Sequence, residues 1–354
     1  MRALLCERFG PVRDVALLDT SDAPSPGPSE VTIAVHYASV SHATKLLIEG
    51  RYQTRPPMPF VPGTEAVGQV LACGSAVTRL RPGDRVVALA RWGCYAERLT
   101  LPEHTVYAVP DGLDPLQALP VPISYGTAYC GLLWRAAMQP GETVLVLGAG
   151  SGVGLAAVEL AALLGARVIA CASTEAKRQA ARNAGAFHAM AADDGMAAAV
   201  KALTAGRGAD IVFDPVGGAA FGRAIRAAAA NARMLSVGFA SGDVPQAPLN
   251  LLLVKNIALH GFFFGRYIGW TPADERVVHA PAMQRAMATL FDWARSQRIH
   301  PAVTAVYPIA ELAAALQALE SRQVVGKVAL KIISETSPCN PSPPIAAAAR
   351  DATP

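Results

Sequence analysis

Four glycines, at positions 148, 150, 152 and 154, stand between the apolar run VLVL and a long apolar stretch that ends near Ala166. This order predicts a buried strand that turns sharply into a helix. Glycines let the backbone approach a pyrophosphate, and the helix N-terminus offers unpaired N–H groups and the positive end of its dipole. The run GAGSGVG lacks the literal GxGxxG spacing, and a bland tight turn is the alternative. We predict a dinucleotide site at Gly150, Ser151, Gly152, Val153 and Gly154.

Strand and helix patterns alternate around this glycine cluster. Short apolar strand patterns occur in TVLVLGA, ARVIACA, DIVFDPV and RMLSVGF, and helical patterns rich in Ala and Leu occur at 155–165, 174–184, 195–205 and 219–230. This βαβα order predicts a parallel sheet with helices on both faces. Residues from about 121 to 258 are therefore expected to form a doubly wound, Rossmann-type domain in an α/β protein.

The first 120 residues follow a different pattern. VTIAVHYASV alternates like a half-buried strand, and GTEAVGQVLACG, GDRVVALA and YAERLTL are further short strand-like runs. Closely spaced short strands predict a compact barrel or sandwich. Three later runs, IALHGFFFG, AVTAVYPI and VGKVALKII, accompany predicted helices near 282–297 and 309–321. Their periodicity leaves open whether they extend the sheet or return to the first domain. Residues 334–354, rich in Pro, Ser and Ala, are predicted to be a disordered tail.

The end of the second strand bears on the choice of coenzyme. Sites specific for NAD place an acidic residue there, about 20 residues after the glycines, to bind the ribose 2′-hydroxyl. Here the strand ends in CAST, with Ala172 and Ser173 at that position and Lys177 and Arg178 shortly after. A hydroxyl with two nearby cations suits a 2′-phosphate, so we expect NADPH as cofactor, bound in part by these three polar residues. In the alternative interpretation, Ser173 only caps the next helix and the cations are solvated.

Composition excludes several classes of protein. Of the 354 residues, 52% are hydrophobic and 16% are charged, so the chain can form large cores in two domains. The net charge of +4 includes no Lys/Arg block, which argues against a nucleic-acid partner. The longest apolar helix candidate, 154–166, contains Glu159 and is shorter than the roughly 20 residues that span a bilayer, so no membrane partner is expected. The six cysteines are widely separated, which indicates reduced thiols and a cytoplasmic protein.

These segments together resemble the medium-chain dehydrogenase/reductase superfamily, in particular its zinc-independent quinone oxidoreductase branch. The resemblance covers about residues 1–333 and rests on the order and spacing of six stretches. They are LLIEGRYQTRPPMPFVPGTEAVGQV at 46–70, SYGTAYCGLL at 124–133, the glycine segment, VFDPVGG at 212–218, VGFASG at 237–242 and PLNLLLVKNIALHGFFFG at 248–265. The resemblance implies a GroES-like β-barrel catalytic domain made of residues 1–120 and 259–333, with the Rossmann domain, 121–258, inserted between them.

The resemblance also bears on metal binding. Zinc-dependent members use a cysteine near the start and a later Gly-His-Glu, and they hold a structural zinc with four closely spaced cysteines. Here Ser41 and Thr64 occupy the first two positions, and only Cys94 occurs between residues 90 and 105. Because His42 and Glu65 alone do not make a tetrahedral zinc site, we expect a packed or hydrogen-bonded histidine, a structural carboxylate and no metal. Without a Lewis acid, the easier acceptors are quinones and α,β-unsaturated carbonyls, whose conjugation accepts the charge.

The resemblance assigns further residues to the site. Tyr52, in GRYQ, matches a tyrosine at the substrate cleft, where a phenol can stack on a quinone or donate to its oxygen; a half-buried structural tyrosine is the alternative. Ser41 and Thr44 replace the asparagine and aspartate of many relatives, so the acceptor pocket departs from the family pattern. Thr127 matches the position that faces the nicotinamide. The other expected cofactor contacts are Phe239, Phe264 and Gly265 at the nicotinamide and Arg322 at the 2′-phosphate, with Lys327 and Asn256 as weaker candidates.

Three functions remain open at this point. The first is an NADPH-dependent quinone oxidoreductase that transfers hydride from the nicotinamide to a small quinone. The second is an NADPH-dependent enone or enoyl-thioester reductase, which shares the cofactor site and differs in its acceptor pocket. The third is a non-catalytic NADPH-binding protein with a structural or sensing role, because a fold alone does not establish an activity. The family implies a homodimer, for which the apolar run at 257–264 can supply an edge strand.

Overall fold

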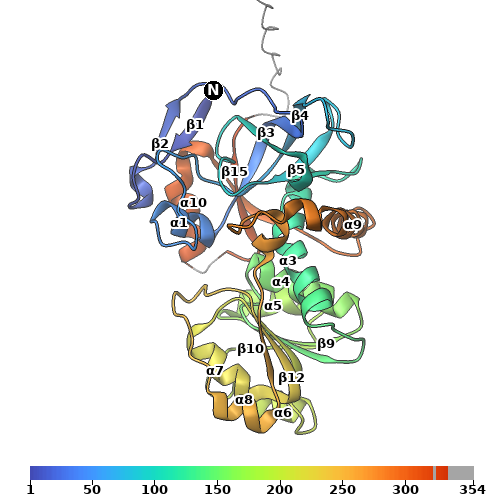
Figure 1. Ribbon diagram of the computed structural model, residues 1–354. Coiled ribbons are helices and arrows are strands. Elements are labelled where there is room, and N and C mark those ends of the chain that lie inside the picture. Colours follow the sequence, from blue (N-terminus) through green and yellow to red (C-terminus); the bar gives the residue numbers. More distant parts are fainter. Residues whose placement is uncertain (322–323, 334–354) are drawn as a thin grey trace, which may run out of the picture.

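The chain is divided between two lobes that a layer of short helices joins. The computed structural model describes residues 1–321 and 324–333. In Figure 1 one lobe lies above the other. The predicted tail, 334–354, and the predicted cofactor residue Arg322 lie outside the described residues. One lobe contains a mostly antiparallel sheet and the other a six-stranded parallel sheet, so the predicted mixed α/β class is confirmed.

The upper lobe is built on a seven-stranded sheet. Its strand order is β14-β15-β3-β4-β5-β7, and β6 also pairs with β3. The prediction that β3 is half-buried is wrong, because residues 31–35 are all buried. Val31 and Val35 join the barrel core, and the hydroxyl of Thr32 lies 2.8 Å from that of Thr100. The strands are β3 (Glu30–Val40), β4 (Glu65–Cys73), β5 (Arg85–Leu89), β6 (Arg98–Pro102), β7 (Val106–Ala108), β14 (Val303–Pro308) and β15 (Lys327–Lys331).

The C-terminal segment completes this barrel. β15 pairs antiparallel with β3 and parallel with β14, and α10 (Leu312–Glu320) packs on the same core. Two further elements lie in this lobe, the β1 (Arg2–Leu5)–β2 (Ala16–Asp19) ribbon and α1 (His42–Ile48). The sequence periodicity left the destination of β14 and β15 open, and the structure places both in the barrel sheet.

The lower lobe is a doubly wound parallel sheet with the order β10-β9-β8-β11-β12-β13. The order reverses between β8 and β11, which is the point where ligands bind in such sheets. The strands are β8 (Thr143–Val146), β9 (Arg167–Cys171), β10 (His188–Met190), β11 (Ala209–Asp214), β12 (Ala228–Ser236) and β13 (Ala258–Gly261). The covering helices are α4 (Gly152–Leu163), α5 (Glu175–Asn183), α6 (Met196–Leu203), α7 (Gly218–Ala227) and α8 (Leu249–Lys255).

The expected domain boundary after residue 258 needs correction. β13 pairs in parallel with β12 in the register Arg233–Ala258 to Ser236–Gly261, so the Rossmann sheet continues through Gly261. The strand expected at 257–265 ends there, and a 3-10 turn, η5 (Phe264–Ile268), follows. β13 is the outermost strand of this sheet, and the chain leaves it toward the upper lobe (Figure 1).

Helix α4 explains how the two lobes meet. The helix is apolar on nearly all sides, because it packs against the sheet on one side and against α3 (Gly126–Tyr129) and η3 (Val121–Tyr125) on the other. Its residues Ala157 and Leu160 are fully buried. Helix α9 (Arg276–Arg295) packs on the same short helices. It begins at Arg276, six residues before the predicted start near residue 282, and contains Pro281 within its length.

The cysteines and helices bear on the remaining expectations from composition. Burial raises the pKa of each of the five cysteines in the described part of the chain, and all five are free thiols, as predicted: Cys6, Cys73, Cys94, Cys130 and Cys171. Among the helices of residues 1–321 and 324–333, none has both the length and the apolar character that crossing a membrane requires.

Candidate dinucleotide-binding and active site

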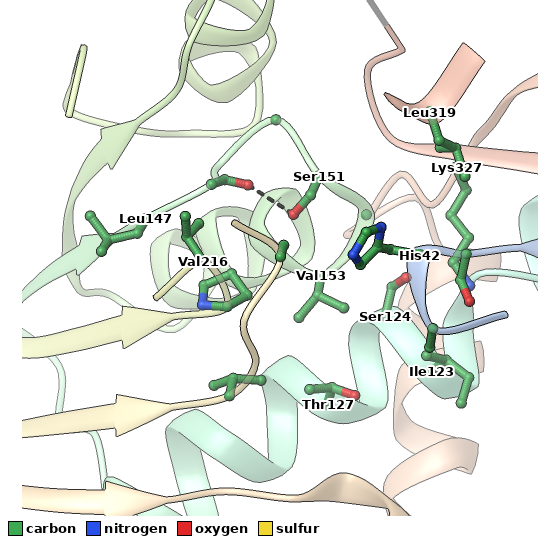
Figure 2. A pocket seen from close by; sticks show the side chains of 18 of the residues that line it. His42, Ile123, Ser124, Thr127, Leu147, Ser151, Val153, Val216, Leu319 and Lys327 are labelled. Carbon is green, nitrogen blue, oxygen red and sulfur yellow. Dashed lines mark hydrogen bonds between the residues drawn. The ribbon is translucent and has the colours of Figure 1, made fainter. Parts of the chain in front are cut away.

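The glycine loop connects β8 to α4 in a conformation that side chains would block. A Cβ on Gly154 would lie 2.2 Å from the carbonyl oxygen of Gly148, so the helix packs directly on the strand end. A Cβ on Gly150 would lie 2.5 Å from Cγ of Lys177. Ser151 caps the helix: its hydroxyl donates to the Gly148 carbonyl (2.8 Å) and accepts from the Gly154 amide (3.1 Å) (Figure 2).

A cavity of about 820 Å³ lies between the two lobes, next to this loop. It runs along the carboxyl ends of β8, β9, β11 and β12, on both sides of the point where the strand order reverses. The first helical residues of α4, Gly152 and Val153, line it, and their amides belong to the first turn, which has no intrahelical acceptors. The predicted residues Gly150 and Ser151 line it as well, whereas Gly154 lies behind them and lets the helix pack closely. The cavity wall therefore fits a bound pyrophosphate.

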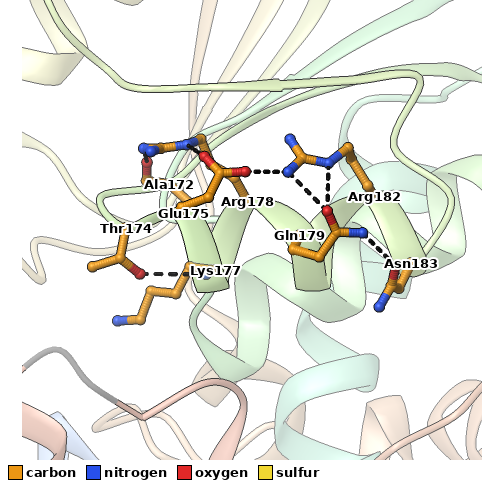
Figure 3. A network of polar contacts seen from close by, with 8 residues as sticks. All are labelled: Ala172, Thr174, Glu175, Lys177, Arg178, Gln179, Arg182 and Asn183. Atoms are coloured by element: carbon orange, nitrogen blue, oxygen red, sulfur yellow. Dashed lines mark hydrogen bonds and ion pairs between the residues drawn. The ribbon is translucent and has the colours of Figure 1, made fainter.

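The end of β9 presents polar side chains to the same cavity. Ser173 and Lys177 line it, and the stem of Lys177 crosses Gly150. The alternative role of Ser173 as a helix cap is corrected, because Thr174 caps α5: its hydroxyl accepts from the Lys177 amide at 3.3 Å (Figure 3). Among the described residues of the Rossmann lobe, no carboxylate lines the cavity. The acidic residue in the cavity lining is Glu320, which belongs to the barrel lobe.

Arg178 is held on another side of helix α5. Its guanidinium donates to a carboxylate oxygen of Glu175 (2.8 Å) and to the carbonyl of Ala172 (3.1 Å), and it lies outside the cavity lining (Figure 3). Hydrogen bonds from Arg178 and Arg182 lower the pKa of the Glu175 carboxyl. The structure thus separates two cations that the sequence prediction grouped at one phosphate.

The three residues predicted at the acceptor end all line the cavity. Thr127 projects from α3 and is 6% exposed, and Tyr52 follows α1 and is half-buried. Burial raises the pKa of the Tyr52 phenol. Ser41 caps α1: its hydroxyl accepts from the Thr44 amide (3.3 Å) and lies 3.1 Å from the Thr44 hydroxyl. The Ser41 hydroxyl is therefore partly committed to the helix it begins.

An aromatic wall closes this end of the cavity. Phe264, Gly265 and Trp270 line it, as predicted for the first two. Arg91 of the barrel lobe holds the loop that carries Trp270, by donating from Nε to the carbonyl of Gly269 (2.8 Å). Phe239, which the sequence prediction placed at the nicotinamide, is 41% exposed and lies outside the cavity lining. Its ring instead packs against Gly217 at the end of β11.

Comparisons with known proteins match this architecture. The model of the alcohol dehydrogenase GroES-like domain matches residues 27–111, and that of the zinc-binding dehydrogenase family matches residues 152–279. The quinone oxidoreductase-like protein 2 homolog of Nematostella vectensis is 36% identical over 334 residues, covering 93% of this chain and 88% of that protein. The chain belongs to the quinone oxidoreductase branch of the medium-chain dehydrogenase/reductase superfamily.

Solved structures of this superfamily agree closely with the fold. A mycobacterial protein solved in complex with NADPH superimposes with a TM-score of 0.85 at 30% identity, covering 94% of this chain and 100% of that one. The quinone oxidoreductase of Thermus thermophilus, whose NADPH complex is also solved, gives a TM-score of 0.77 at 31% identity, with 94% and 100% covered. Membership in this branch makes the chain an NAD(P)-dependent oxidoreductase with a GroES-like domain and a Rossmann domain.

One of the two family models is described as zinc-binding, so the residues that this chain has at the expected zinc positions decide whether it can bind a metal. Glu65 is fully buried, forms an ion pair with Lys327 and accepts a hydrogen bond from the Ile123 amide at 2.9 Å. Lys327 also donates to the Ser39 hydroxyl at 3.3 Å. The prediction that Glu65 is a structural carboxylate is confirmed. Within residues 1–321 and 324–333, no cluster of three or more His, Cys, Asp or Glu side chains could hold a metal ion.

The structure adds three residues to the site that sequence reasoning missed or ranked low. His42, expected to be packed or hydrogen-bonded, is exposed and lines the cavity, so it is not packed; partial burial is the main cause that lowers its pKa (Figure 2). Lys327, a weak candidate, lines the cavity beside Gly152, whereas Asn256 ends helix α8 outside it. Ser124, three residues before Thr127 in the same SYGTAY segment, was not predicted and is a buried part of the wall.

Proposed function

We propose that this chain is an NADPH-dependent quinone oxidoreductase that transfers hydride to a small quinone without a metal ion. The observation that carries the proposal is one continuous cavity. Its cofactor end holds the α4 N-terminus and Lys177, and its acceptor end holds Tyr52, Phe264 and Trp270. When bound, NADPH supplies the hydride. The names of the relatives support the acceptor class, and the two NADPH complexes support the cofactor.

The residues of the cofactor end favour NADPH over NADH. Gly152 and Val153 line the cavity, and their first-turn amides suit a pyrophosphate. Ser173 and Lys177 stand where an NAD site would have its carboxylate, so a 2′-phosphate meets a hydroxyl and an ammonium in place of a repulsive charge. The dipole of α4 and the Lys177 charge act on different phosphates, so the two contributions can be measured separately.

The acceptor end suits a planar, electron-poor ring. Aromatic side chains from η5 and its following loop offer flat apolar surfaces for stacking. Reduction of a quinone places negative charge on a carbonyl oxygen, and the Tyr52 Oη can donate a hydrogen bond to it. Because burial raises its pKa, the phenol stays protonated and remains a donor across the physiological range. Thr127, which lines the same cavity, positions the ring that delivers the hydride.

The ion pair at Glu65 supports chemistry without a metal. The one carboxylate at the position of a zinc ligand in the zinc-dependent members has both oxygens engaged within the protein, one by the Lys327 ammonium and the other by the Ile123 amide. A quinone needs no Lewis acid, because its conjugated carbonyls accept the charge themselves. Elemental analysis of pure protein is expected to show less than one zinc per chain, and a full equivalent would overturn this part of the proposal.

Steady-state kinetics tests the acceptor class directly. NADPH oxidation is measured against 1,2-naphthoquinone and against a simple enone, with NADH in parallel. We expect fast turnover with NADPH and the quinone, and slow turnover with the enone or with NADH. A preference for the enone would show that the pocket serves an alkene reductase. NADPH binding without turnover of either acceptor would instead favour a non-catalytic role.

We propose further that the active protein is a homodimer. β13 is the outer strand of the Rossmann sheet, and helix α8 beside it exposes Leu249, Leu253 and Val254, each more than 70% accessible. An unpaired strand edge next to exposed apolar side chains favours pairing with a second copy. Light scattering after size exclusion is expected to give twice the mass of one chain. Replacement of Leu253 by Lys should shift the mass toward one chain, and a monomeric wild type would contradict the proposal.

A further inference from the structure

Ser124 holds a buried hydroxyl that the fold itself does not satisfy. The residue lies in the π-helical turn η3, and only 1% of its surface is exposed. Its backbone is fixed, since its own amide donates to Pro120 at 3.0 Å and the neighbouring Ile123 amide donates to Glu65 at 2.9 Å. Its Oγ is one of three buried side-chain polar atoms in the described chain that have no hydrogen-bond partner. Native proteins tolerate few such atoms, and each one calls for an explanation.

The place of this hydroxyl distinguishes it from the other two atoms. Those atoms are Oε2 of Glu103 and Oη of Tyr107, and neither residue lines the cavity. Ser124 does line it, and its Oγ lies 3.1 Å from the point where a Cβ on Gly152 would stand. Gly152 is the first helical residue of α4. Figure 2 shows the Ser124 hydroxyl beside Val153 and Lys327, at the start of this helix.

The protein groups around Ser124 already have other partners. The Lys327 ammonium is shared between Glu65 and Ser39, and the second Glu65 oxygen accepts from Ile123. On its side toward α4, Ser124 lies at the helix start beside the Lys327 side chain, and the helix amides and the ammonium are donors that offer no acceptor to a hydroxyl. A group that satisfies Ser124 there must accept hydrogen bonds from the hydroxyl and the helix amides together. A phosphate oxygen has this chemistry.

The geometry points to Ser124 as a pyrophosphate ligand: its Oγ donates a hydrogen bond to the diphosphate of the bound dinucleotide, together with the α4 amides. This inference rests on dinucleotide binding in the cavity and is independent of which acceptor is reduced. An unsatisfied buried hydroxyl destabilises the free protein, and the hydrogen bond forms only in the complex. Ser124 therefore lowers the stability of the ligand-free protein and raises its affinity for the dinucleotide. A purely structural serine does not have both effects.

Binding of four nucleotides distinguishes a ligand of the diphosphate from a ligand of the 2′-phosphate and from a purely structural serine. NADPH, NADH and adenosine diphosphate ribose all contain the diphosphate, whereas adenosine 2′-monophosphate contains the 2′-phosphate and neither phosphate of the diphosphate. In Ser124→Ala, the dissociation constants of the first three are expected to rise by about tenfold, which is 1.4 kcal/mol, as for loss of one hydrogen bond to a charged group. The dissociation constant of adenosine 2′-monophosphate is expected to stay at the wild-type value. Isothermal titration calorimetry measures all four without an acceptor.

A matched control removes another unpartnered buried hydroxyl. Tyr107→Phe deletes one far from the cavity and should leave all four dissociation constants unchanged. The thermal midpoints of both ligand-free variants should equal or exceed that of the wild type, because neither loses a hydrogen bond. Wild-type affinity of Ser124→Ala for adenosine diphosphate ribose would overturn the inference, as would an equal loss of affinity for adenosine 2′-monophosphate. Failure of quinone turnover would leave these affinities untouched, so the two proposals fail separately.

Discussion

The two ends of the central cavity are built in different ways. At the cofactor end the determinants are mostly main-chain features: the close approach of Gly154 to Gly148, the cap at Ser151 and the first amides of α4. At the acceptor end they are side chains that converge from separate segments, such as Tyr52 after α1, Thr127 on α3 and Trp270 after η5. The first kind of site tolerates few substitutions, whereas the second can change its acceptor through single side chains.

The buried pair of Lys327 and Glu65 lies where these two ends join, and its loss should have the largest effect. Lys327→Met leaves a carboxylate buried without its partner, which typically costs about 3–5 kcal/mol of unfolding free energy. Chemical denaturation measures the change. Lys331→Met, at the exposed end of the same strand, is the matched control and should change stability by less than about 0.5 kcal/mol. Equal stability of the two variants would mean that the pair does not support the junction.

The main-chain nature of the cofactor end predicts that one methyl group is enough to damage it. In Gly154→Ala, the new Cβ would meet the Gly148 carbonyl at 2.2 Å, so the helix must move away from the strand. We expect a loss of roughly 1–3 kcal/mol of unfolding free energy, together with weaker binding of NADPH. The contrasting variant is Gly222→Ala in α7, where a Cβ meets nothing closer than 3.9 Å. It should stabilise the protein slightly, by up to about 1 kcal/mol. A harmless Gly154→Ala would contradict the close-packing argument.

The same difference explains how far sequence reasoning reached. The glycine loop is predictable because strand, turn and helix cap are encoded within one short segment, and the residues from Gly150 to Gly154 lie as the pattern indicates. The parallel sheet follows from alternating strands and helices. The end of the sheet was misplaced because β13 and the residues after it form one apolar run, in which nothing local marks Gly261 as the last paired residue.

Side-chain direction was harder to predict. Lys177 and Arg178 are neighbours in sequence, but successive residues of a helix point about 100° apart, and only the first reaches the cavity. The VGFASG segment predicted Phe239 at the nicotinamide, whereas its ring packs against Gly217 outside the cavity lining. Ser124 and His42 acquire their positions only when the barrel docks against α4, a tertiary contact that leaves no mark on local sequence.

Lys177 tests whether coenzyme choice belongs to the side-chain or the main-chain part of the cofactor end. Lys177→Ala should raise the dissociation constant of NADPH about 10- to 100-fold, as expected for loss of a charge-assisted hydrogen bond, and should change that of NADH far less. Arg178→Ala, which removes the cation bound to Glu175, should leave the preference unchanged. Fluorescence titration with both coenzymes gives the ratio. An equal loss for NADPH and NADH would remove this account of the coenzyme.

Tyr52 tests the acceptor end, where the smallest effect is expected. Tyr52→Phe keeps the ring for stacking and removes the hydroxyl, so kcat with a quinone should fall about two- to tenfold while the dissociation constant of NADPH stays unchanged. Burial raises the pKa of this phenol above the ordinary tyrosine value of about 10, so the wild-type donor stays protonated and its advantage over the variant should persist up to about pH 10. An advantage that has fallen by half at about pH 10 would indicate an ordinary, solvated phenol. Identical kcat values at every pH would make Tyr52 a structural tyrosine and leave stacking by Phe264 and Trp270 to hold the acceptor.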